Sequence, residues 1–133
     1  MGSAKTFDEL IVGEGVVYFV DDAPSIIRTK RGLLPSLKFD KMISSLPRII
    51  VDMGAVARVA NGADIMRPGV KDMQGDFAKG KLVVIVDEKY GKPIALGITE
   101  VNSEEMRAMS KGKVIENVHY VGDELWRSFG KAG

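Results

Sequence analysis

Short apolar stretches, interrupted every few residues by glycine, proline, asparagine or aspartate, dominate this chain and constrain its fold most. The stretches are rich in β-branched and aromatic residues, as in "VVYFV", "RIIVD" and "LVVIV". Runs of this kind, bounded by turn-forming residues, predict β-strands. Many short strands with few helices indicate a small barrel.

Size and composition place the chain among ordinary globular proteins. With 133 residues, 45% of them hydrophobic and 28% charged, it is long enough for one domain or a small pair. No apolar run approaches the ~18 residues of a membrane helix, so we expect a soluble, cytoplasmic protein without membrane contact. The absence of cysteine excludes disulfides, thiolate metal sites and a cysteine nucleophile. The net charge of +1 excludes a strongly basic nucleic-acid binder, so any such affinity must come from local clusters.

The first 46 residues predict a small unit that depends on the rest of the chain. β-Branched and aromatic residues on both sides of "DDAPS" predict a hairpin over residues 16–27. Gly32 and Pro35 are expected to break the chain, after which Leu37, Met42 and Leu46 line one face of a short helix. A unit of this size approaches the limit for an independent core. We therefore expect it to pack on the remainder.

The remaining residues predict strands with three short helices. Asp52 is placed to cap a helix over residues 53–60, and Asn61-Gly62 to end it. Ser103 is expected to cap a second helix, and "GDELWRSF" to form a terminal helical turn. Strands are expected over residues 48–52, 63–66, 82–87, 94–101 and 114–121. Trp126 and Phe129 are expected to close the barrel, although an exposed Trp126 would instead stack a base.

The motifs of common catalytic sites are incomplete in this chain. "GDFAKGKL" satisfies part of a phosphate-binding loop, but Leu82 stands where a magnesium-binding Ser or Thr is needed, and a strand follows instead of a helix. His119 is the only histidine and has no companion nucleophile or metal ligands, which favours a structural or groove-lining role. We therefore predict no catalytic residues, no metal, no cofactor and no enzymatic activity.

The segment "GADIMRPGV" combines uncovered backbone with positive charge. Gly62 and Ala63 leave the main chain accessible, Pro68-Gly69 forms a corner, and cationic side chains surround it. Small residues admit a ribose-phosphate chain, free N–H groups bond phosphate, and arginine binds phosphate through two hydrogen bonds. Spacing alone favours a tight turn carrying scattered surface arginines over a nucleic-acid site.

Three segments in this order resemble the PUA domain, a small RNA-binding pseudobarrel. They are "VDMGAVARVANGADIMRPGV", "GDFAKGKLVVIVDEKYGKPIALGITEVNSEEM" and "IENVHYVGDELW". Together they are similar to the translation-associated PUA proteins related to the malignant T-cell amplified sequence protein. The resemblance covers residues 48–129. The part before it is shorter than in the eukaryotic relatives.

The resemblance implies an α+β fold: a C-terminal PUA-type β-pseudobarrel with short helices over residues 47–133, and a small N-terminal hairpin-helix subdomain over residues 1–46. It also implies an RNA groove along the first helix of the domain, the Gly-Ala turn and the Pro-Gly corner. Carried over by position, the RNA-binding residues are Arg58, Asn61, Gly62, Ala63, Arg67, Pro68 and Gly69, with Lys71 and Lys81 as weaker neighbours.

The function implied by the resemblance is non-catalytic RNA binding in translation, with structured RNA or the acceptor end of tRNA as the target. The expected partners are tRNA or rRNA, and with them the small ribosomal subunit or a translation factor, but not DNA. Two alternatives stay open: an accessory RNA-targeting module for an RNA-modifying enzyme, and a protein-interaction adaptor.

Overall fold

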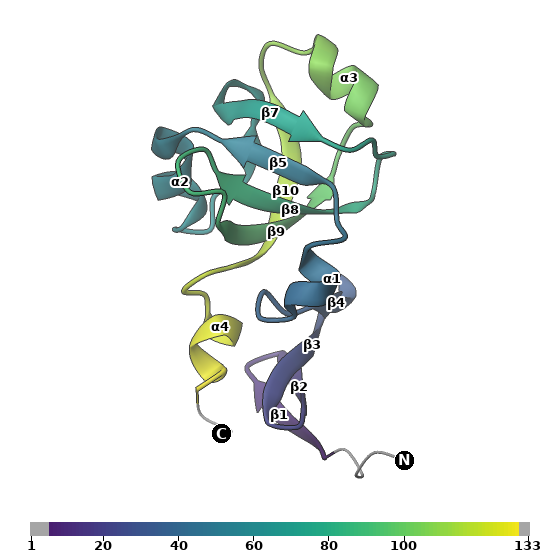
Figure 1. Cartoon of the computed structure of the whole chain (residues 1–133), viewed down its shortest axis with the longest axis vertical. Coiled ribbons are helices and arrows are strands. Elements are labelled where there is room, and N and C mark those ends of the chain that lie inside the picture. Colours follow the sequence, from purple (N-terminus) through teal and green to yellow (C-terminus); the bar gives the residue numbers. More distant parts are fainter. Residues whose placement is uncertain (1–5, 131–133) are drawn as a thin grey trace.

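The computed structural model describes residues 6–130, which form two β-rich parts stacked end to end (Figure 1). The N-terminal part is a four-stranded sheet, and the C-terminal part is a six-stranded sheet with short helices at its rim. After the last strand the chain returns toward the N-terminal part as a short helix, α4 (Glu124–Ser128). In the described part, no helix has the length and apolarity needed to cross a membrane.

The N-terminal sheet is an antiparallel meander of β1 (Phe7–Val12), β2 (Gly15–Val20), β3 (Ala23–Thr29) and β4 (Gly32–Pro35). The predicted hairpin is confirmed as β2 and β3. Its turn is tighter than "DDAPS" indicated, because Asp21 and Asp22 both adopt positive φ values, 51° and 66°. Two residues at positive φ match the twist of a two-residue hairpin.

Gly32 and Pro35 interrupt the chain as predicted, but they do so at the two ends of a strand, β4, that was not predicted. Gly32 has a φ of 96°, which lets the chain reverse after β3 and pair back along it. The predicted helix is also shorter than expected: α1 spans only Asp40–Ile43. It buries Ile43, whereas the Met42 side chain, expected on the apolar face, is 42% exposed.

The C-terminal sheet contains β5 (Arg48–Val51), β6 (Ile65–Met66), β7 (Val70–Gln74), β8 (Leu82–Asp87), β9 (Pro93–Thr99) and β10 (Lys113–Tyr120). The strand order is β6-β10-β9-β8-β5-β7, with β5 parallel to β8 and the other pairs antiparallel. Strand β7 was not predicted.

The sheet must curl, because its two edge strands are nearly consecutive in the chain. Only the 3-10 turn η1 (Arg67–Gly69) separates β6 from β7. In a flat sheet of six strands these edges would lie about 24 Å apart, since neighbouring strands are about 4.8 Å apart. The connection spans at most about 14 Å. The predicted small barrel is therefore a curled mixed sheet, a half-barrel closed on one side by η1.

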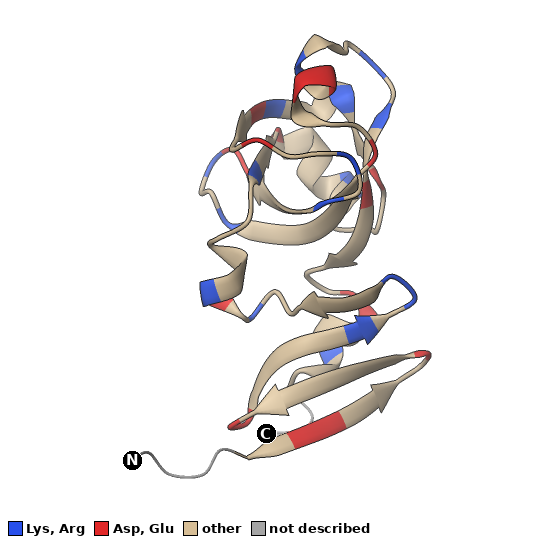
Figure 2. Ribbon diagram, turned by 90° about the vertical axis from the view of Figure 1, so that its right-hand side faces the viewer, with Lys and Arg blue, Asp and Glu red and all other residues tan. Residues whose placement is uncertain are grey.

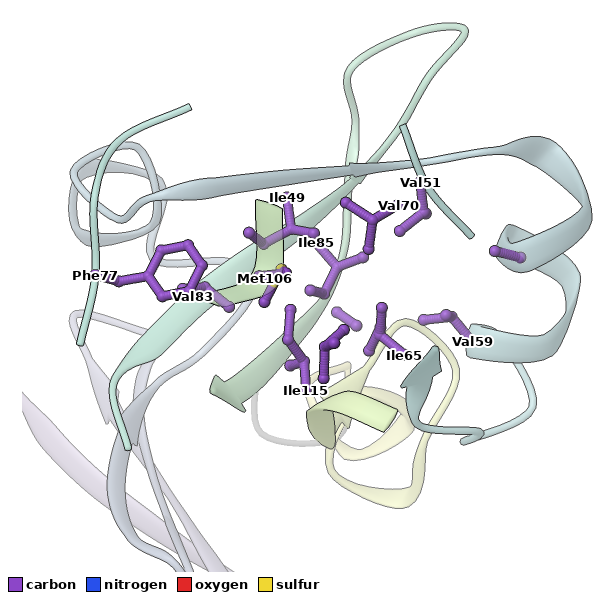
Figure 3. Close-up of a cluster of buried hydrophobic side chains, with 13 residues drawn as sticks. Ile49, Val51, Val59, Ile65, Val70, Phe77, Val83, Ile85, Met106 and Ile115 are labelled. Atoms are coloured by element: carbon purple, nitrogen blue, oxygen red, sulfur yellow. The ribbon is translucent and has the colours of Figure 1, made fainter. Parts of the chain in front are cut away.

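The interior of the curled sheet is the main hydrophobic core (Figure 3). Alternate residues of β5 and β8 point inward, among them Ile49 and Ile85. Val114 and Ile115 of β10 join them, and Met106 reaches the same cluster from α3 (Ser103–Ala108). Burying an aliphatic side chain of this size contributes about 1.5–3 kcal/mol. The cluster therefore fixes the strands that carry the surface turns.

The outer face of the same sheet is also buried, and it joins the two parts. Val84, Val86 and Leu96 pack against Leu37 and Ile43 from the N-terminal part. Trp126 contacts both this cluster and the N-terminal core, and Phe129 lies in the N-terminal core. The prediction that Trp126 and Phe129 close the barrel is therefore wrong: they fill the junction between the parts.

Candidate nucleic-acid interface

The turn that follows α2 (Met53–Val59) is shaped by a glycine that no other residue replaces without strain. Asp52 caps the helix as predicted, its Oδ1 accepting the Ala55 N–H at 2.7 Å. Gly62 has a φ of 90°, and a Cβ there would lie 3.2 Å from Cε1 and Oη of Tyr120. Backbone conformation and close ring packing both require glycine at this position.

The N–H groups of this turn are already used inside the protein. The Gly62 N–H donates to the Val59 carbonyl at 2.9 Å, and the Ala63 N–H donates to the Arg58 carbonyl at 3.1 Å. The expectation that they remain free for phosphate is therefore wrong, because they complete the C-terminal hydrogen bonds of α2. What the turn offers to a ligand is the small, exposed Ala63 and the side chains around it.

Arg58 and the Pro68-Gly69 corner lie together, as predicted for one surface. Gly69 is buried against α2: a Cβ at this position would lie 2.9 Å from Ala55 Cβ and 3.9 Å from Nη2 of Arg58. The Asp52 N–H donates to the Gly69 carbonyl at 2.9 Å, which fixes the corner to the start of the helix. The exposed Arg58 guanidinium thus stands over the corner.

Asn61 is exposed at the end of α2, with its Nδ2 donating to the Ala57 carbonyl at 2.9 Å. Its side-chain amide therefore helps to end the helix. It is less available to a ligand than a surface amide without such a hydrogen bond.

Arg67 is half-buried, and its guanidinium is committed to main-chain carbonyls. Nε donates to the Met106 carbonyl at 2.6 Å, and Nη1 donates to the Val70 carbonyl at 3.1 Å. Its contacts tie η1 to α3 and β7. The sequence did not indicate that Arg67 would bond to main-chain carbonyls, because one of its partners, Met106, lies 39 residues away.

The two lysines that were expected as weaker neighbours differ in position. Lys71 is exposed on β7 and lines a shallow depression of about 230 Å³ with Arg67, Asp72 and Arg107. Lys81 precedes β8, whose hydrogen-bonded neighbours are β5 and β9, so the sheet order does not bring it to β6. Its N–H donates to Thr99 Oγ1 at 2.9 Å.

Asn117 and Tyr120 of β10 support the turn and were not singled out from the sequence. Asn117 Nδ2 donates to the carbonyls of Val59 and Ala63, at 3.2 and 3.1 Å, and the Asn117 N–H donates to Asp64 Oδ1 at 2.9 Å. The sequence feature that could have indicated these two residues is the "ENVHY" segment. It was predicted to be a strand, but no role was predicted for its side chains.

The charges around the turn are mixed. Asp64, next to the turn, is paired with Lys113 Nζ at 3.1 Å, and this hydrogen bond raises the pKa of Lys113. Figure 2 shows acidic and basic residues interspersed over both parts of the ribbon. Arg58 is thus a single positive charge among side chains of both signs. A ligand bound at this turn therefore meets few positive charges.

His119 is buried and has a structural position. Its Nδ1 lies 2.7 Å from Asp123 Oδ2, and its Nε2 accepts the Leu37 N–H at 3.4 Å. Among residues 6–130, no group of three or more side chains is arranged to hold a metal ion.

Comparison with known proteins identifies relatives along most of the chain. It is 39% identical to an uncharacterised protein of Methanocaldococcus jannaschii, over 83% of this chain and 68% of that protein. It is 35% identical to translation machinery-associated protein 20 of Saccharomyces cerevisiae, over 92% of this chain and 72% of the relative. It is 34% identical to malignant T-cell-amplified sequence 1 of Rattus norvegicus, over 61% of this chain and 46% of the relative.

Solved structures share the fold. A hypothetical protein of Pyrococcus horikoshii matches with a TM-score of 0.80 and 28% identity, over 94% of this chain and 80% of that chain. A chain in an H/ACA ribonucleoprotein bound to a substrate RNA matches with a TM-score of 0.59 and 28% identity, over 71% of this chain and 29% of that chain.

The PUA-domain family model matches residues 47–121, which span β5 to β10 and include the turn, the corner and the side chains that support them. The resemblance found in the sequence is confirmed, and the chain belongs to the PUA-domain family.

Proposed function

We propose that this protein is a non-catalytic, cytoplasmic RNA-binding protein of the translation machinery, and that it recognises structured RNA or the acceptor end of tRNA. The family match supports RNA binding, and the name of the yeast relative supports a role in translation. The H/ACA ribonucleoprotein supports it further, since a similar domain occurs there in a complex with RNA.

The observation that carries the proposal is the juxtaposition of Arg58, the exposed Ala63 and the Pro68-Gly69 corner. Arg58 supplies a charged donor for phosphate, and Ala63 leaves room for the sugar-phosphate chain to approach. Because the turn's own N–H groups are occupied, side chains supply the phosphate contacts. We expect two to four phosphate contacts, each contributing about −0.7 to the logarithmic salt slope for a single strand.

RNA titration of an Ala63→Asp variant tests the proposal. Aspartate adds bulk and negative charge where the RNA backbone approaches, so the affinity should fall at least about tenfold, while folding persists because the side chain is exposed. Ala108→Asp is the matched control: it makes the same change on an exposed residue of α3, at the other end of the curled sheet from α2 (Figure 1).

The targets should be a tRNA, a hairpin RNA and the small ribosomal subunit. Equal affinity of wild type, Ala63→Asp and Ala108→Asp for each would refute the proposed surface. No binding of any RNA by wild type would refute RNA recognition and favour the protein-interaction adaptor.

A second function is favoured by one comparison. The H/ACA chain contains the similar domain as only 29% of its length, so the fold also serves as one module of a larger ribonucleoprotein subunit. An accessory module that brings RNA to a modifying enzyme would co-purify with that enzyme. A translation protein would instead co-sediment with ribosomal subunits from the same lysate.

A further inference from the structure

Strand β1 forms an open edge of the N-terminal sheet, far from the proposed RNA surface (Figure 1). Within residues 6–130, its hydrogen-bonded neighbour is β2 alone. The Asp21 N–H donates to the Thr6 carbonyl at 2.9 Å, and hydrogen-bonded positions alternate along an antiparallel pair. Every second residue from Thr6 therefore bonds to β2. The N–H and C=O groups of Phe7, Glu9 and Ile11 point away from the sheet.

The β1 edge lacks the features that usually protect an exposed strand, namely proline, lysine, a bulge or a very short length. The opposite edge has two of them, because β4 is four residues long and ends at Pro35. In contrast, β1 has six residues, pairs with β2 in an unbroken register, and contains neither proline nor lysine. Its Phe7 and Ile11 side chains are each 74% exposed. The β1 edge can therefore accept a further strand.

A groove of about 520 Å³ lies beside this edge, between β1 and α4. Residues 10–13 form one wall, and Glu124, Arg127 and Ser128 of α4 form the other. Leu10 and Val12 make the β1 wall apolar. Domains that add a peptide strand to a sheet edge gain affinity from main-chain hydrogen bonds and specificity from pockets that receive alternate side chains. The edge and the groove together supply both features.

The charge of this region indicates the chemistry of the added strand. Residues 6–27 contain five carboxylates and neither lysine nor arginine; the acids are Asp8, Glu9, Glu14, Asp21 and Asp22. In Figure 2 the outermost strand of this sheet carries red and no blue. RNA is repelled by such a surface. A second copy of β1 is also disfavoured, because its acids would lie against the same acids, and like charges across paired strands are destabilising.

We propose that a partner protein binds here through an extended basic segment, which adds to the β1 edge as a fifth strand of the N-terminal sheet. Its alternate apolar side chains enter the groove beside α4. The side chains between them are lysine or arginine, whose stems cover Phe7 and Ile11 while their charged ends reach Glu9. This protein site is additional to the proposed RNA surface and does not depend on it.

Amide hydrogen exchange of the intact protein tests the proposal with a defined probe. The probe is an octapeptide of alternating lysine and valine, and an octapeptide of alternating glutamate and valine is its charge control. The lysine peptide should slow exchange most at Phe7, Glu9 and Ile11, and much less at Asp8, Leu10 and Val12, which already bond to β2. The glutamate peptide should bind several-fold more weakly, a modest difference because exposed ion pairs are weak.

Substitutions at Glu9 separate the main-chain contacts from the charge. Glu9→Pro removes an N–H that β2 does not use, and proline is tolerated at such edge positions, so the protein should fold. This variant should bind the lysine peptide at least about tenfold more weakly, because a main-chain hydrogen bond is lost and the ring obstructs the added strand. Glu9→Gln keeps the N–H, and should lose only the preference for the lysine peptide.

The matched control is Leu33→Pro on the opposite edge. Leu33 is exposed, and its N–H points away from β3, since the Ser36 N–H donates to the Ser25 carbonyl at 2.8 Å and the alternation runs back from there. Its peptide affinity should equal that of wild type. Equal weakening by Leu33→Pro and Glu9→Pro, protection that does not alternate along β1, or failure of the lysine peptide to bind would overturn the proposal.

Two further measurements assign the occupant of the edge. Sedimentation of the protein alone should show a monomer; a dimer that Glu9→Pro dissociates would show that β1 binds a second copy, and would overturn the basic partner. RNA titration of Glu9→Pro should match wild type. A loss of RNA affinity in this folded variant would overturn the separation of the two surfaces, whereas failure of peptide binding alone leaves the proposed function standing.

Discussion

At the scale of single residues, the two arginines near the Gly62-Ala63 turn have different surroundings. Arg58 is exposed beside the Pro68-Gly69 corner, and its guanidinium is available to a ligand. Arg67 is half-buried and donates to the carbonyls of Met106 and Val70. Arg58 therefore belongs to the surface, and Arg67 belongs first to the framework beneath it.

Arginine-to-alanine substitutions should separate these two roles. Arg67→Ala leaves two carbonyls without their donor and should lower the free energy of unfolding by about 1–3 kcal/mol. Arg58→Ala should change that free energy by less than about 0.5 kcal/mol, but should weaken RNA binding. Urea unfolding of both variants, together with RNA titration, checks this. A stability loss confined to Arg58→Ala would contradict the assignment.

At the scale of elements, α4 depends on one carboxylate. A helix of five residues is too short to form alone. Asp123 accepts the Trp126 N–H at 2.7 Å, the Tyr120 N–H at 2.9 Å and the Nδ1–H of His119 at 2.7 Å. Since His119 Nε2 accepts the Leu37 N–H, the ring proton is on Nδ1. The same carboxylate thus caps α4 and links it to the N-terminal part.

The stability supplied by Asp123 should depend on pH. Burial alone would raise the pKa of this carboxyl, but the hydrogen bonds from His119, Trp126 and Tyr120 lower it below the ordinary 3.8. A lowered folded-state pKa means that the contribution is complete above about pH 4 and is lost as the pH falls through the folded-state value. Asp123→Asn should therefore destabilise the protein at pH 7, and the difference from wild type should shrink below pH 4.

Fluorescence of Trp126, the only tryptophan, follows this transition directly. Urea titrations at several pH values should be compared with those of Asp40→Asn, which changes an exposed carboxyl at the start of α1. A constant difference between wild type and Asp123→Asn down to pH 2 would show that Asp123 acts without its charge.

At the scale of the whole molecule, the two parts share buried surface and should unfold together. Leu37 and Ile43 cover Val84, Val86 and Leu96 on the outer face of the curled sheet. Leu34 is also buried, but Leu33 is 66% exposed and contributes little. The junction thus depends on a few residues just before β5 and on α4.

Deletion of residues 1–46 tests the predicted boundary between the subdomains. Removing these residues exposes the apolar outer face of the sheet, and each large side chain returned to water costs about 1.5–3 kcal/mol. The remaining chain should melt at a lower temperature and bind a hydrophobic dye, whereas the whole chain should unfold in one transition. An unchanged melting temperature without dye binding would show that the parts are independent.

The part of the fold that was predictable from sequence is local. The β2–β3 hairpin, the Asp52 cap, the Gly62 turn that follows α2 and strand β8 each depend on residues within a few positions of one another. Ser103 shows the limit: Asn102 is the cap, accepting the Glu105 N–H at 2.8 Å, while Ser103 is buried and its Oγ accepts the Phe77 N–H. From the sequence alone, two adjacent cap-forming residues cannot be told apart. Here the hydrogen bond with the distant Phe77 engages Ser103, and Asn102 is left to cap the helix.

The sequence by itself determined the local segments and, through its motifs, the family, because turn formers, caps and apolar alternation act between near neighbours. Only the tertiary structure decided which side chains remain free. Arg67 is drawn inward by Met106, Trp126 fills a junction instead of closing the barrel, and Asn117 reaches Ala63 from 54 positions away. These contacts follow from the curl of the sheet, which depends on all of its strands at once and on the apolar core that they enclose.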